Sequence, residues 1–269
     1  MMHRPIRTAR RAFAGAVALG LAAGLAVPVS AQAPAAGQVS AFTDAQKAEM
    51  GRFVREYLLA NPEIIGEAVA ALEKKQAEAQ KVAQARALKE SASLLAGAAY
   101  DTVAGNPQGD VTLVEFFDYN CTYCKAALAD LQALVKADPK LRVVLKDLPV
   151  LGPDSLEAHR VAVAAKQQLS GDRAFEYHAK LLSTRGRVNA ERATAIAREM
   201  GLDMTRLSRD TMSPVVAQSV VQTRDLSEQL GINGTPAYVI GDEVVSGAVG
   251  QGPLKQAVAA MRQCGRAIC

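Results

Sequence analysis

The chain has 269 residues, of which 49% are hydrophobic and only 4% aromatic, with four cysteines and no tryptophan. This length accommodates one domain of ordinary size with an additional segment, or two small domains. Four arginines (Arg4, Arg7, Arg10 and Arg11) precede residue 32, where no acidic residue occurs. Without them the 31 basic residues become 27, equal to the 27 acidic ones. A neutral chain offers no electrostatic basis for nucleic-acid binding, and we expect no nucleic-acid partner.

Residues 1–31 have the pattern of an export signal, because basic residues precede an apolar run over Ala12–Val27 and then small residues. We expect cleavage after Ala31 and a periplasmic mature protein, in which disulfide chemistry is permitted. A membrane anchor is less favoured, since the run is short and rich in alanine and glycine. Arg10-Arg11 leaves the twin-arginine export route open, but the Sec route is favoured.

Residues 32–41 are expected to form a disordered leader, and residues 42–98 a helical segment. The sequence Thr43-Asp44-Ala45-Gln46 is a capping box that starts a helix ending near residue 59. Pro62 suits the first position of a second helix, which meets no breaker as far as residue 95. At 1.5 Å per residue, that helix would be about 50 Å long.

Both helices of this segment carry an apolar stripe, whereas the second helix beyond Lys74 has almost nothing to bury. A monomeric core does not explain this distribution. The stripes either pack against other subunits, with the polar part as a spacer, or fold back onto the main domain. We favour a homo-oligomer, a dimer or a trimer. The stripe residues are Phe53, Val54, Tyr57, Leu58, Ile64, Ile65, Ala68, Val69 and Leu72.

From residue 101 the pattern changes to that of an α/β domain. Two apolar strands separated by an amphipathic helix form a βαβ unit, and a strand with a hairpin follows later. Strands are expected at 111–117, 141–146 and 237–240, the last turning at Gly241-Asp242. Helices are expected at 121–136 and 253–262, with about five pieces between 153 and 230.

The sequence Cys121-Thr122-Tyr123-Cys124 lies where the first strand ends and its helix begins. Free N–H groups and the helix dipole at that end stabilise a thiolate at Cys121. Cys124, one turn into the helix, is placed to resolve a mixed disulfide. A zinc site would need two more ligands with suitable spacing, and a purely structural disulfide is unusual inside an α/β unit. We therefore expect a redox dithiol with neither metal nor cofactor.

A second motif, Gly234-Thr235-Pro236, comes directly before the strand at 237–240. Proline at this position predicts a fixed turn with a cis peptide bond, rather than an ordinary loop. Beside the dithiol, this turn would leave the backbone of Thr235 free to pair with a substrate strand, and it would block metal capture by the thiols.

Residues 101–263 resemble the DsbA-type branch of the thioredoxin superfamily, through the sequences VEFFDYNCTYC over 114–124 and GINGTP over 231–236. The resemblance implies a thioredoxin-like α/β fold with a helical insertion at about 150–230, and a dithiol oxidoreductase acting on exported proteins. It also identifies Glu115 with a buried acid that accepts the proton of Cys124. Lys146, at the end of the next strand, is expected to pair with Glu115. The alternatives are a plain structural ion pair or, for Lys146, a solvent-facing charge.

Residues 42–98 resemble the N-terminal module of suppressor-of-copper-sensitivity type C (ScsC-like) proteins, which assembles subunits so that their dithiols face one another. Two departures bear on the direction of the chemistry. Asn120 replaces the tryptophan of reducing thioredoxins, and Thr-Tyr replaces the Pro-His of strong oxidases. The second departure implies a less depressed pKa of Cys121 and a less oxidising couple. Thr235 before the proline, together with Tyr123, resembles disulfide isomerases, which need a potential around −180 mV rather than −120 mV.

Substrates are expected to be unfolded or misoxidised exported proteins, and the redox partner a membrane protein. A monomeric DsbA-like oxidase is the first alternative, and a non-enzymatic Cu(I)-handling or chaperone protein is the second. Asp118 is expected near the surface in a turn, and His159 and His178 as surface or core residues. Cys264 and Cys269 lie in a C-terminal tail at 264–269, where a local structural disulfide is favoured over a second redox relay.

Overall fold

The computed structural model describes residues 42–269. The expected signal peptide and leader, residues 1–41, lie outside the described residues. The chain divides into two compact units, the first ending at Ile65 and the second spanning Gly66–Cys269. Within the described residues, no helix is both long and apolar enough to cross a membrane.

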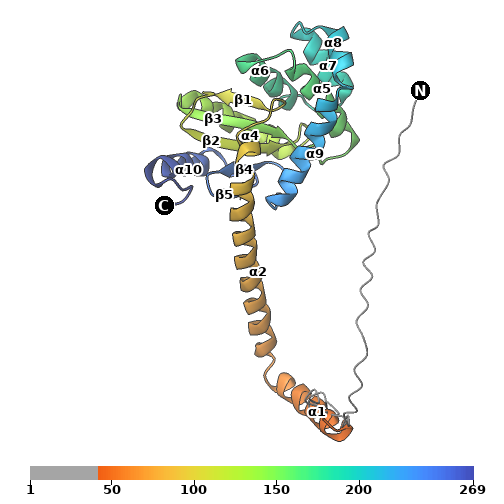
Figure 1. Cartoon of the computed structure of the whole chain (residues 1–269), viewed down its shortest axis with the longest axis vertical. Helices are drawn as coiled ribbons and strands as arrows, with labels where there is room; N and C mark the ends of the chain where they lie inside the picture. The colour runs from red at the N-terminus through yellow and green to blue at the C-terminus, as the bar shows by residue number, and fades with distance from the viewer. Residues whose placement is uncertain (1–41) are drawn as a thin grey trace, which may run out of the picture. The chain divides into compact units, whose positions relative to one another are not determined.

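The N-terminal helices begin as the sequence predicts. Helix α1 spans Asp44–Ala60, and the side chains of Thr43 and Gln46 form the predicted capping box. Helix α2 spans Glu63–Glu90 and is followed by a short helix α3 over Ala92–Leu95 (Figure 1). The expected uninterrupted helix to residue 95 is therefore wrong.

The interruption at Ser91 has a packing reason. Ser91 is buried, and its hydroxyl lies 3.5 Å from Gln229 Oε1. Turning the chain here brings Leu88 and Leu95 into one hydrophobic cluster. The Gln84 amide also donates to the Leu230 carbonyl at 2.9 Å. The end of α2 thus packs inside the second unit, against residues near the end of α9, although the sequence beyond Lys74 indicated almost nothing to bury.

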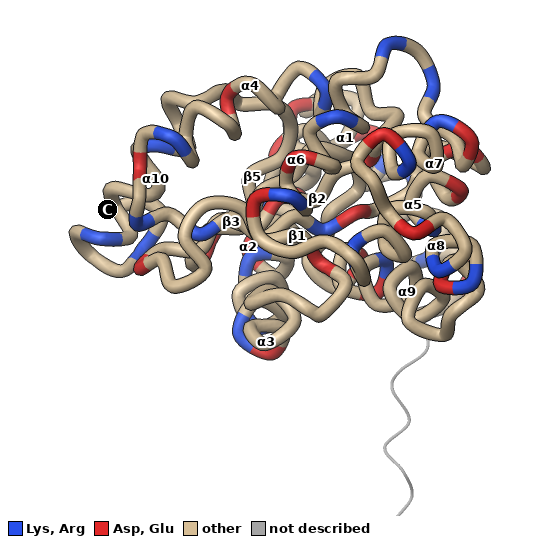
Figure 2. Tube along the Cα trace, turned by 90° about the horizontal axis from the view of Figure 1, so that it is seen from above, with Lys and Arg blue, Asp and Glu red and all other residues tan. Residues whose placement is uncertain are grey.

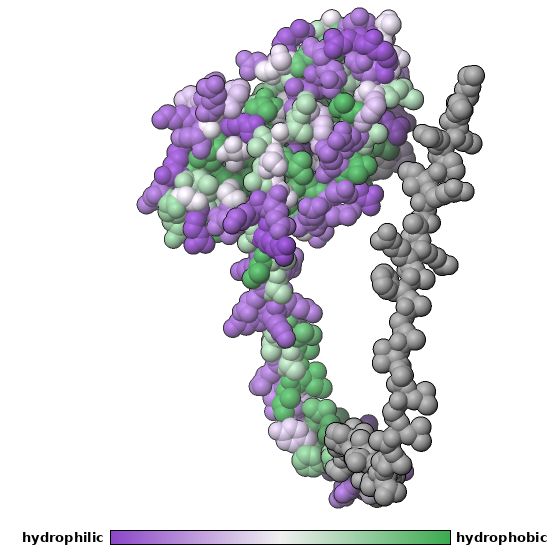
Figure 3. All heavy atoms as spheres, viewed as in Figure 1, coloured by the Kyte–Doolittle hydropathy of each residue, from purple (hydrophilic) through white to green (hydrophobic). Residues whose placement is uncertain are grey.

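The apolar stripe of the N-terminal helices is exposed. No residue of α1 is buried, and Leu88 alone is buried in α2. Figure 3 shows hydrophobic residues on the visible surface of α1 and of the first half of α2. Apolar side chains in these helices that are about half exposed or more are Met50, Phe53, Val54, Tyr57, Leu59, Ile65, Val69, Leu72 and Val82.

The second unit is built on a five-stranded sheet with the order β1-β3-β2-β4-β5. Only β2 and β3 are parallel among these neighbours, and α4 connects them as the predicted βαβ unit. Strand β1, which the sequence analysis missed, pairs antiparallel with β3. The strands are β1 Thr102–Gly105, β2 Val111–Phe117, β3 Leu141–Asp147, β4 Ala237–Ile240 and β5 Glu243–Ser246.

Helices cover both faces of the sheet. Alternate residues of β2 point to opposite faces, so Leu113 and Phe117 join one hydrophobic cluster while Val114 and Phe116 join another. The first cluster includes residues of α4 (Thr122–Ala137) and α10 (Gln251–Cys264), and the second includes residues of α2, α3 and α9. The fold is therefore the expected thioredoxin-like α/β arrangement.

Five helices lie between β3 and β4, as predicted, with both signs of charge interspersed along the trace (Figure 2). They are α5 Pro153–Lys166, α6 Gly171–Leu182, α7 Ala190–Glu199, α8 Met204–Asp210 and α9 Pro214–Gln229. After α10, a disulfide joins Cys264 to Cys269, which confirms the favoured local pairing.

Candidate active site

The two cysteines of the C-x-x-C motif lie at the N-terminus of α4. Cys121 is the N-cap residue, and its Sγ accepts a hydrogen bond from the backbone N–H of Cys124 at 3.3 Å. Both thiols are free, with Cys121 5% exposed and Cys124 fully buried. Cys121 is thus the sulfur nearer to solvent, as an attacking thiol must be.

The turn before β4 lies beside Cys121 at the N-terminus of α4. Strand β4 pairs antiparallel with β2, with Ala237 opposite Phe116, which brings the residues before Ala237 beside the end of β2. The carbonyl oxygen of Thr235 lies 3.1 Å from Cys121 Sγ. The Thr235–Pro236 peptide bond is cis, as predicted.

The surroundings of the two thiols shift their pKa values in opposite directions. A hydrogen bond from the Cys124 thiol is the main cause that lowers the pKa of Cys121 to about 6, against the opposing effect of burial. Thr235 and backbone N–H groups lower it further. The same bond to Cys121, together with burial, raises the pKa of Cys124. At neutral pH, Cys121 is therefore a thiolate while Cys124 keeps its proton.

Glu115 lies on β2 and is 2% exposed. Burial, and then the charge of Cys121, raise the pKa of this carboxyl to about 8. Its Oε2 has no hydrogen-bond partner among the described residues. Glu115 is therefore a protonated acid at neutral pH while Cys121 is a thiolate, and its role in proton transfer stays a prediction.

The expected pairing of Lys146 with Glu115 is wrong. Glu115 lies opposite Leu145 in the sheet register, whereas Lys146 lies opposite Phe116. Because successive side chains of a strand point to opposite faces, Lys146 is directed away from Glu115. Its Nζ instead donates to Asp101 Oδ2 at 2.6 Å, and both side chains are buried.

The expected surface position of Asp118 is also wrong, because this side chain is fully buried. One carboxylate oxygen accepts from Asn120 N and Ser155 Oγ, both at 2.7 Å. The other accepts from Val150 N at 2.9 Å and Leu151 N at 3.0 Å. The Asp118 carbonyl accepts from Cys121 N at 3.0 Å. Asp118 therefore joins the redox turn to the loop after β3 and to α5.

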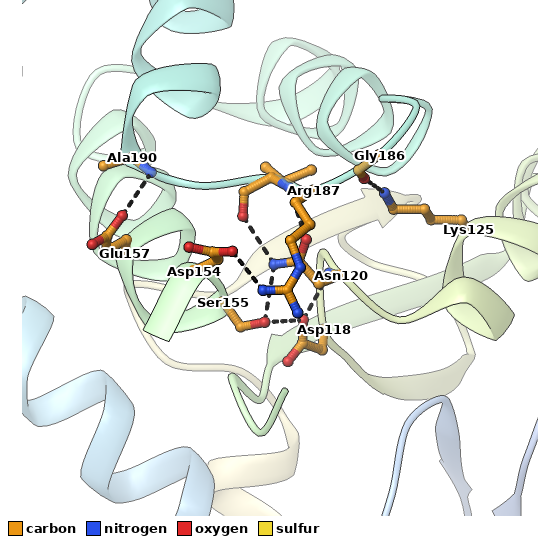
Figure 4. Close-up of polar contacts among 10 residues, drawn as sticks. Asp118, Asn120, Lys125, Asp154, Ser155, Glu157, Gly186, Arg187 and Ala190 are labelled. Carbon is orange, nitrogen blue, oxygen red and sulfur yellow. Dashed lines mark hydrogen bonds and ion pairs between the residues drawn. The ribbon is translucent and has the colours of Figure 1, made fainter. Parts of the chain in front are cut away.

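Asn120, directly before the first cysteine, makes a second link to the insertion. Its amide donates to Ser155 Oγ at 3.0 Å and to the Val188 carbonyl at 2.9 Å, and its oxygen accepts from Val188 N at 2.7 Å. Figure 4 shows Asp118, Asn120 and Ser155 meeting between the redox turn and the insertion. Sequence reasoning missed these contacts. The available signal was the preference of Asp and Asn side chains for local turn bonds.

Both histidines of the insertion belong to the core. His159 Nε2 lies 2.8 Å from Ser219 Oγ, and its Nδ1 lies 3.0 Å from Asp147 Oδ2. His178 packs against Phe117, and burial lowers its pKa to about 3, so it is neutral. Across residues 42–269, no three His, Cys, Asp or Glu side chains gather as a set of metal ligands.

Comparison with known families gives two matches. Residues 112–259 match the DSBA-like thioredoxin domain. Residues 46–79 match the N-terminal domain of the copper resistance protein ScsC. The first match contains Cys121, Cys124, Glu115 and Thr235-Pro236, and the second lies within α1 and α2.

Three solved structures are similar to the chain. A thioredoxin-like oxidoreductase from Silicibacter pomeroyi is 44% identical with a TM-score of 0.60, and the match covers 63% of this chain and 96% of that one. Proteus mirabilis ScsC in a transitional conformation is 30% identical with a TM-score of 0.57, covering 80% and 94%. The thiol-disulfide exchange protein alpha-DsbA2 from Wolbachia pipientis is 26% identical with a TM-score of 0.62, covering 68% and 98%.

Curated relatives include a Na(+)/H(+) antiporter, NhaA 1, of Salinispora arenicola, which is 26% identical over 141 residues. That match covers 52% of this chain and 21% of the antiporter, so the chain spans about a fifth of the length of that relative. Disulfide bond formation protein D of Bacillus subtilis is 23% identical over 167 residues, covering 58% of this chain and 74% of that protein.

Proposed function

This chain belongs to the DSBA-like thioredoxin-domain family, and on that premise we propose that it exchanges disulfides in periplasmic proteins, with isomerisation as its main task. The observation that carries the proposal is the pair of opposite pKa shifts at the dithiol. Cys121 has a pKa of about 6, beside a buried thiol whose pKa is raised. A thiolate nucleophile and a protonated resolving thiol are what thiol–disulfide exchange requires.

The proposed reaction begins with attack of the Cys121 thiolate on a substrate disulfide. One sulfur–sulfur bond forms to Cys121, and the substrate disulfide breaks to release a thiolate. The charge of Cys121 is one cause of the raised pKa of Glu115, so its loss in the mixed disulfide lowers that pKa. Glu115 then gives its proton to solvent, and its carboxylate accepts the proton of Cys124.

The cycle ends in one of two ways. In isomerisation, the released substrate thiolate attacks a different disulfide of the substrate, and the last substrate thiolate displaces Cys121 as a thiolate. In reduction, Cys124 attacks Cys121 Sγ, which forms the Cys121–Cys124 disulfide and releases reduced substrate. Thr235, whose carbonyl lies beside Cys121 Sγ, pairs with the backbone of the bound substrate, next to Pro236.

The N-terminal segment supports isomerisation over simple oxidation. Residues 46–79 match the ScsC N-terminal domain, and the apolar stripe of α1 and α2 is exposed. We assign residues 42–98 to assembly of a dimer or trimer and residues 101–263 to the redox domain. An assembly of several dithiols, each held by a long helix, provides neighbouring thiols to attack wrongly paired cysteines.

A second candidate, a monomeric dithiol oxidase, is favoured by the low pKa of Cys121. Because a stabilised thiolate favours the reduced form, it makes the corresponding disulfide a stronger oxidant. In both candidates the substrates are unfolded or misoxidised exported proteins, and a membrane protein restores the redox state of the dithiol. The mature protein is periplasmic after removal of residues 1–31, by the Sec route.

The proposal is tested with the Cys121→Ser and Cys124→Ser variants in exchange with a disulfide-bonded protein substrate. We expect no reaction for Cys121→Ser, and we expect Cys124→Ser to accumulate a covalent complex that dithiothreitol releases. Equal reactivity of Cys121→Ser and the unaltered protein would contradict the assignment. Tight stoichiometric Cu(I) binding without any exchange would replace it with the metal-handling alternative.

A further inference from the structure

Helix α2 reaches the segment of chain that leads into the cis-proline turn. Three of its residues, Gln80, Gln84 and Leu88, are spaced four apart and lie on one side of the helix. The Gln84 amide donates to the Leu230 carbonyl at 2.9 Å, and a Cβ atom at Gly231 would lie 3.8 Å from Gln80 Nε2. This side of α2 therefore contacts the chain at the point where it leaves α9.

The hydrogen bond of Gln84 satisfies the end of another helix. Leu230 is the C-cap residue of α9 and is fully buried, and the last carbonyls of a helix have no partner within it. Gln84 is half-buried at this contact, whereas Gln76, about two helical turns earlier on α2, is exposed. The Gln84 side chain therefore supplies a donor that α9 cannot supply for its own end.

The residues after Leu230 are held between α2 and α9. Ile232 N donates to the Ser227 carbonyl at 2.8 Å. The Ile232 side chain is buried in the same hydrophobic cluster as Leu88 and Leu230. The two residues that follow Ile232 are exposed. Ile232 is therefore the last buried anchor of this segment before Thr235.

Thr235 is held from both ends of a short span. On one side the anchor is the sheet, where the Pro236 carbonyl accepts from Gly247 N at 2.8 Å. On the other side the anchor is Ile232, and since consecutive Cα atoms are about 3.8 Å apart, its Cα lies no more than about 11 Å from that of Thr235. The Thr235 carbonyl lies 3.1 Å from Cys121 Sγ. A shift of the chain at α2 therefore moves the backbone beside the reactive sulfur.

We propose that Gln84 is a positioning residue for the exchange reaction, because by holding Leu230 it sets where the backbone of Thr235 meets the substrate segment. The proposal rests on the proposed thiol–disulfide exchange, in which that backbone pairs with the substrate. It adds that the helix assigned to assembly also shapes the substrate-binding edge of each site. Cys121 itself is placed by α4, so its reaction with a small reagent should not depend on Gln84.

The test uses Gln84→Glu, which keeps the size of the side chain but turns an acceptor toward the Leu230 carbonyl. Gln76→Glu makes the same change of charge at an exposed position of the same helix. The probe is the symmetric disulfide of a synthetic peptide with one cysteine. Attack by Cys121 forms a mixed disulfide and releases one peptide thiolate, whose initial rate of release is measured against peptide concentration at pH 8. Alkylation by iodoacetamide at the same pH measures the thiolate alone, since this reagent has no backbone to pair.

We expect the half-saturating peptide concentration to rise about fivefold in Gln84→Glu, the order of one weakened hydrogen bond to the substrate, with alkylation unchanged. Gln84→Lys, which keeps a donor, should restore most of the loss, and Gln76→Glu should match the unaltered protein.

An unchanged half-saturating concentration in Gln84→Glu overturns the proposal. A rise that Gln76→Glu or Gln84→Lys shares in full also overturns it, as does a parallel loss of alkylation, since the contact would then support the whole domain. If Gln84→Glu does not fold, Gln84→Ala and its control Gln76→Ala decide in the same way. Absence of peptide exchange in the unaltered protein, with normal alkylation, contradicts the proposed function itself.

Discussion

Cys121 and Cys124 are chemically identical side chains three positions apart, and their surroundings give them different protonation states. Cys121, at the helix N-terminus, has its pKa lowered to about 6 chiefly by the hydrogen bond from Cys124. Cys124 lies fully buried, and its pKa is raised. The difference decides which sulfur attacks and which resolves, and it makes the reactivity of the site dependent on pH.

The rate of alkylation of the reduced protein by iodoacetamide is therefore expected to rise with pH, with a midpoint near pH 6. In Cys124→Ala the midpoint should move upward, because the largest cause of the lowered pKa is removed. The control is Cys121→Ala, in which the alkylation step with a midpoint near pH 6 should be absent. A midpoint above 8 in the unaltered protein would contradict the thiolate assignment.

Glu115 gives a second prediction that depends on pH. Its folded-state pKa of about 8 lies above the unfolded value near 4.3, so the folded protein binds more protons between these limits. Stability therefore falls as pH rises through this window. Glu115→Gln removes this loss. The difference in free energy of unfolding between Glu115→Gln and the unaltered reduced protein should therefore shift in favour of the variant, by on the order of a few kcal/mol, between pH 4 and pH 8.

Urea unfolding at pH 4 and pH 8 measures this change, and Glu199→Gln, at an exposed position of α7, is the matched control. A difference between Glu115→Gln and the unaltered protein that stays constant with pH would show that Glu115 is ionised in the folded state. A slower resolution of the mixed disulfide in Glu115→Gln, with an unchanged first attack, is expected from the proton transfer.

Among the elements, the Asp118 carboxylate makes a large share of the contact between the redox turn, the loop after β3 and the insertion. Asp118→Ala removes the acceptor of four hydrogen bonds, and buried donors left without a partner cost about 1–3 kcal/mol each. We expect a loss of at least 3 kcal/mol in urea unfolding. Asp154→Ala breaks an ion pair whose Arg187 partner is 72% exposed and should cost less than about 1 kcal/mol. Equal losses would refute the role assigned to Asp118.

The elements that the sequence predicts well are those whose signal is local. The apolar run of β2, the amphipathic helix α4 and the hairpin at Gly241-Asp242 each carry their pattern within a few residues. Strand β1 has four residues, ends in Gly105 and pairs with β3 about 40 residues later, so no local pattern marks it. Helix α2 ends at Glu90 because the chain turns there to contact Gln229 and other residues that are distant in the sequence.

The same distinction applies to the candidate site. The two cysteines and Thr235-Pro236 are recognisable because spacing and strand position carry their signal. The partners of Asp118 and Asn120 cannot be recognised from the sequence, because Ser155 and Val188 lie more than 30 residues away in the insertion. The sequence does not identify Asp101 as the partner of Lys146, because the strand register that directs the Lys146 side chain away from Glu115 depends on the assembled sheet.

At the scale of the whole molecule, the proposed assembly makes a prediction about mass. Val54 in α1 is 51% exposed, and Val82 in the polar part of α2 is 72% exposed. If the apolar stripe joins subunits, Val54→Glu should dissociate the oligomer because it places a charge in the interface, whereas Val82→Glu should not. Light scattering measures both masses. A monomeric mass for the unaltered protein would remove the structural argument for isomerisation.

The most direct test of the whole account is the recovery of active ribonuclease from its scrambled-disulfide form by catalytic amounts of the mature protein. We predict recovery that requires Cys121 and that falls in Val54→Glu, because isomerisation is proposed to need several neighbouring dithiols. A parallel assay starts from reduced ribonuclease. No recovery from the scrambled form, together with rapid oxidation of the reduced form, would contradict the isomerase assignment and identify a dithiol oxidase.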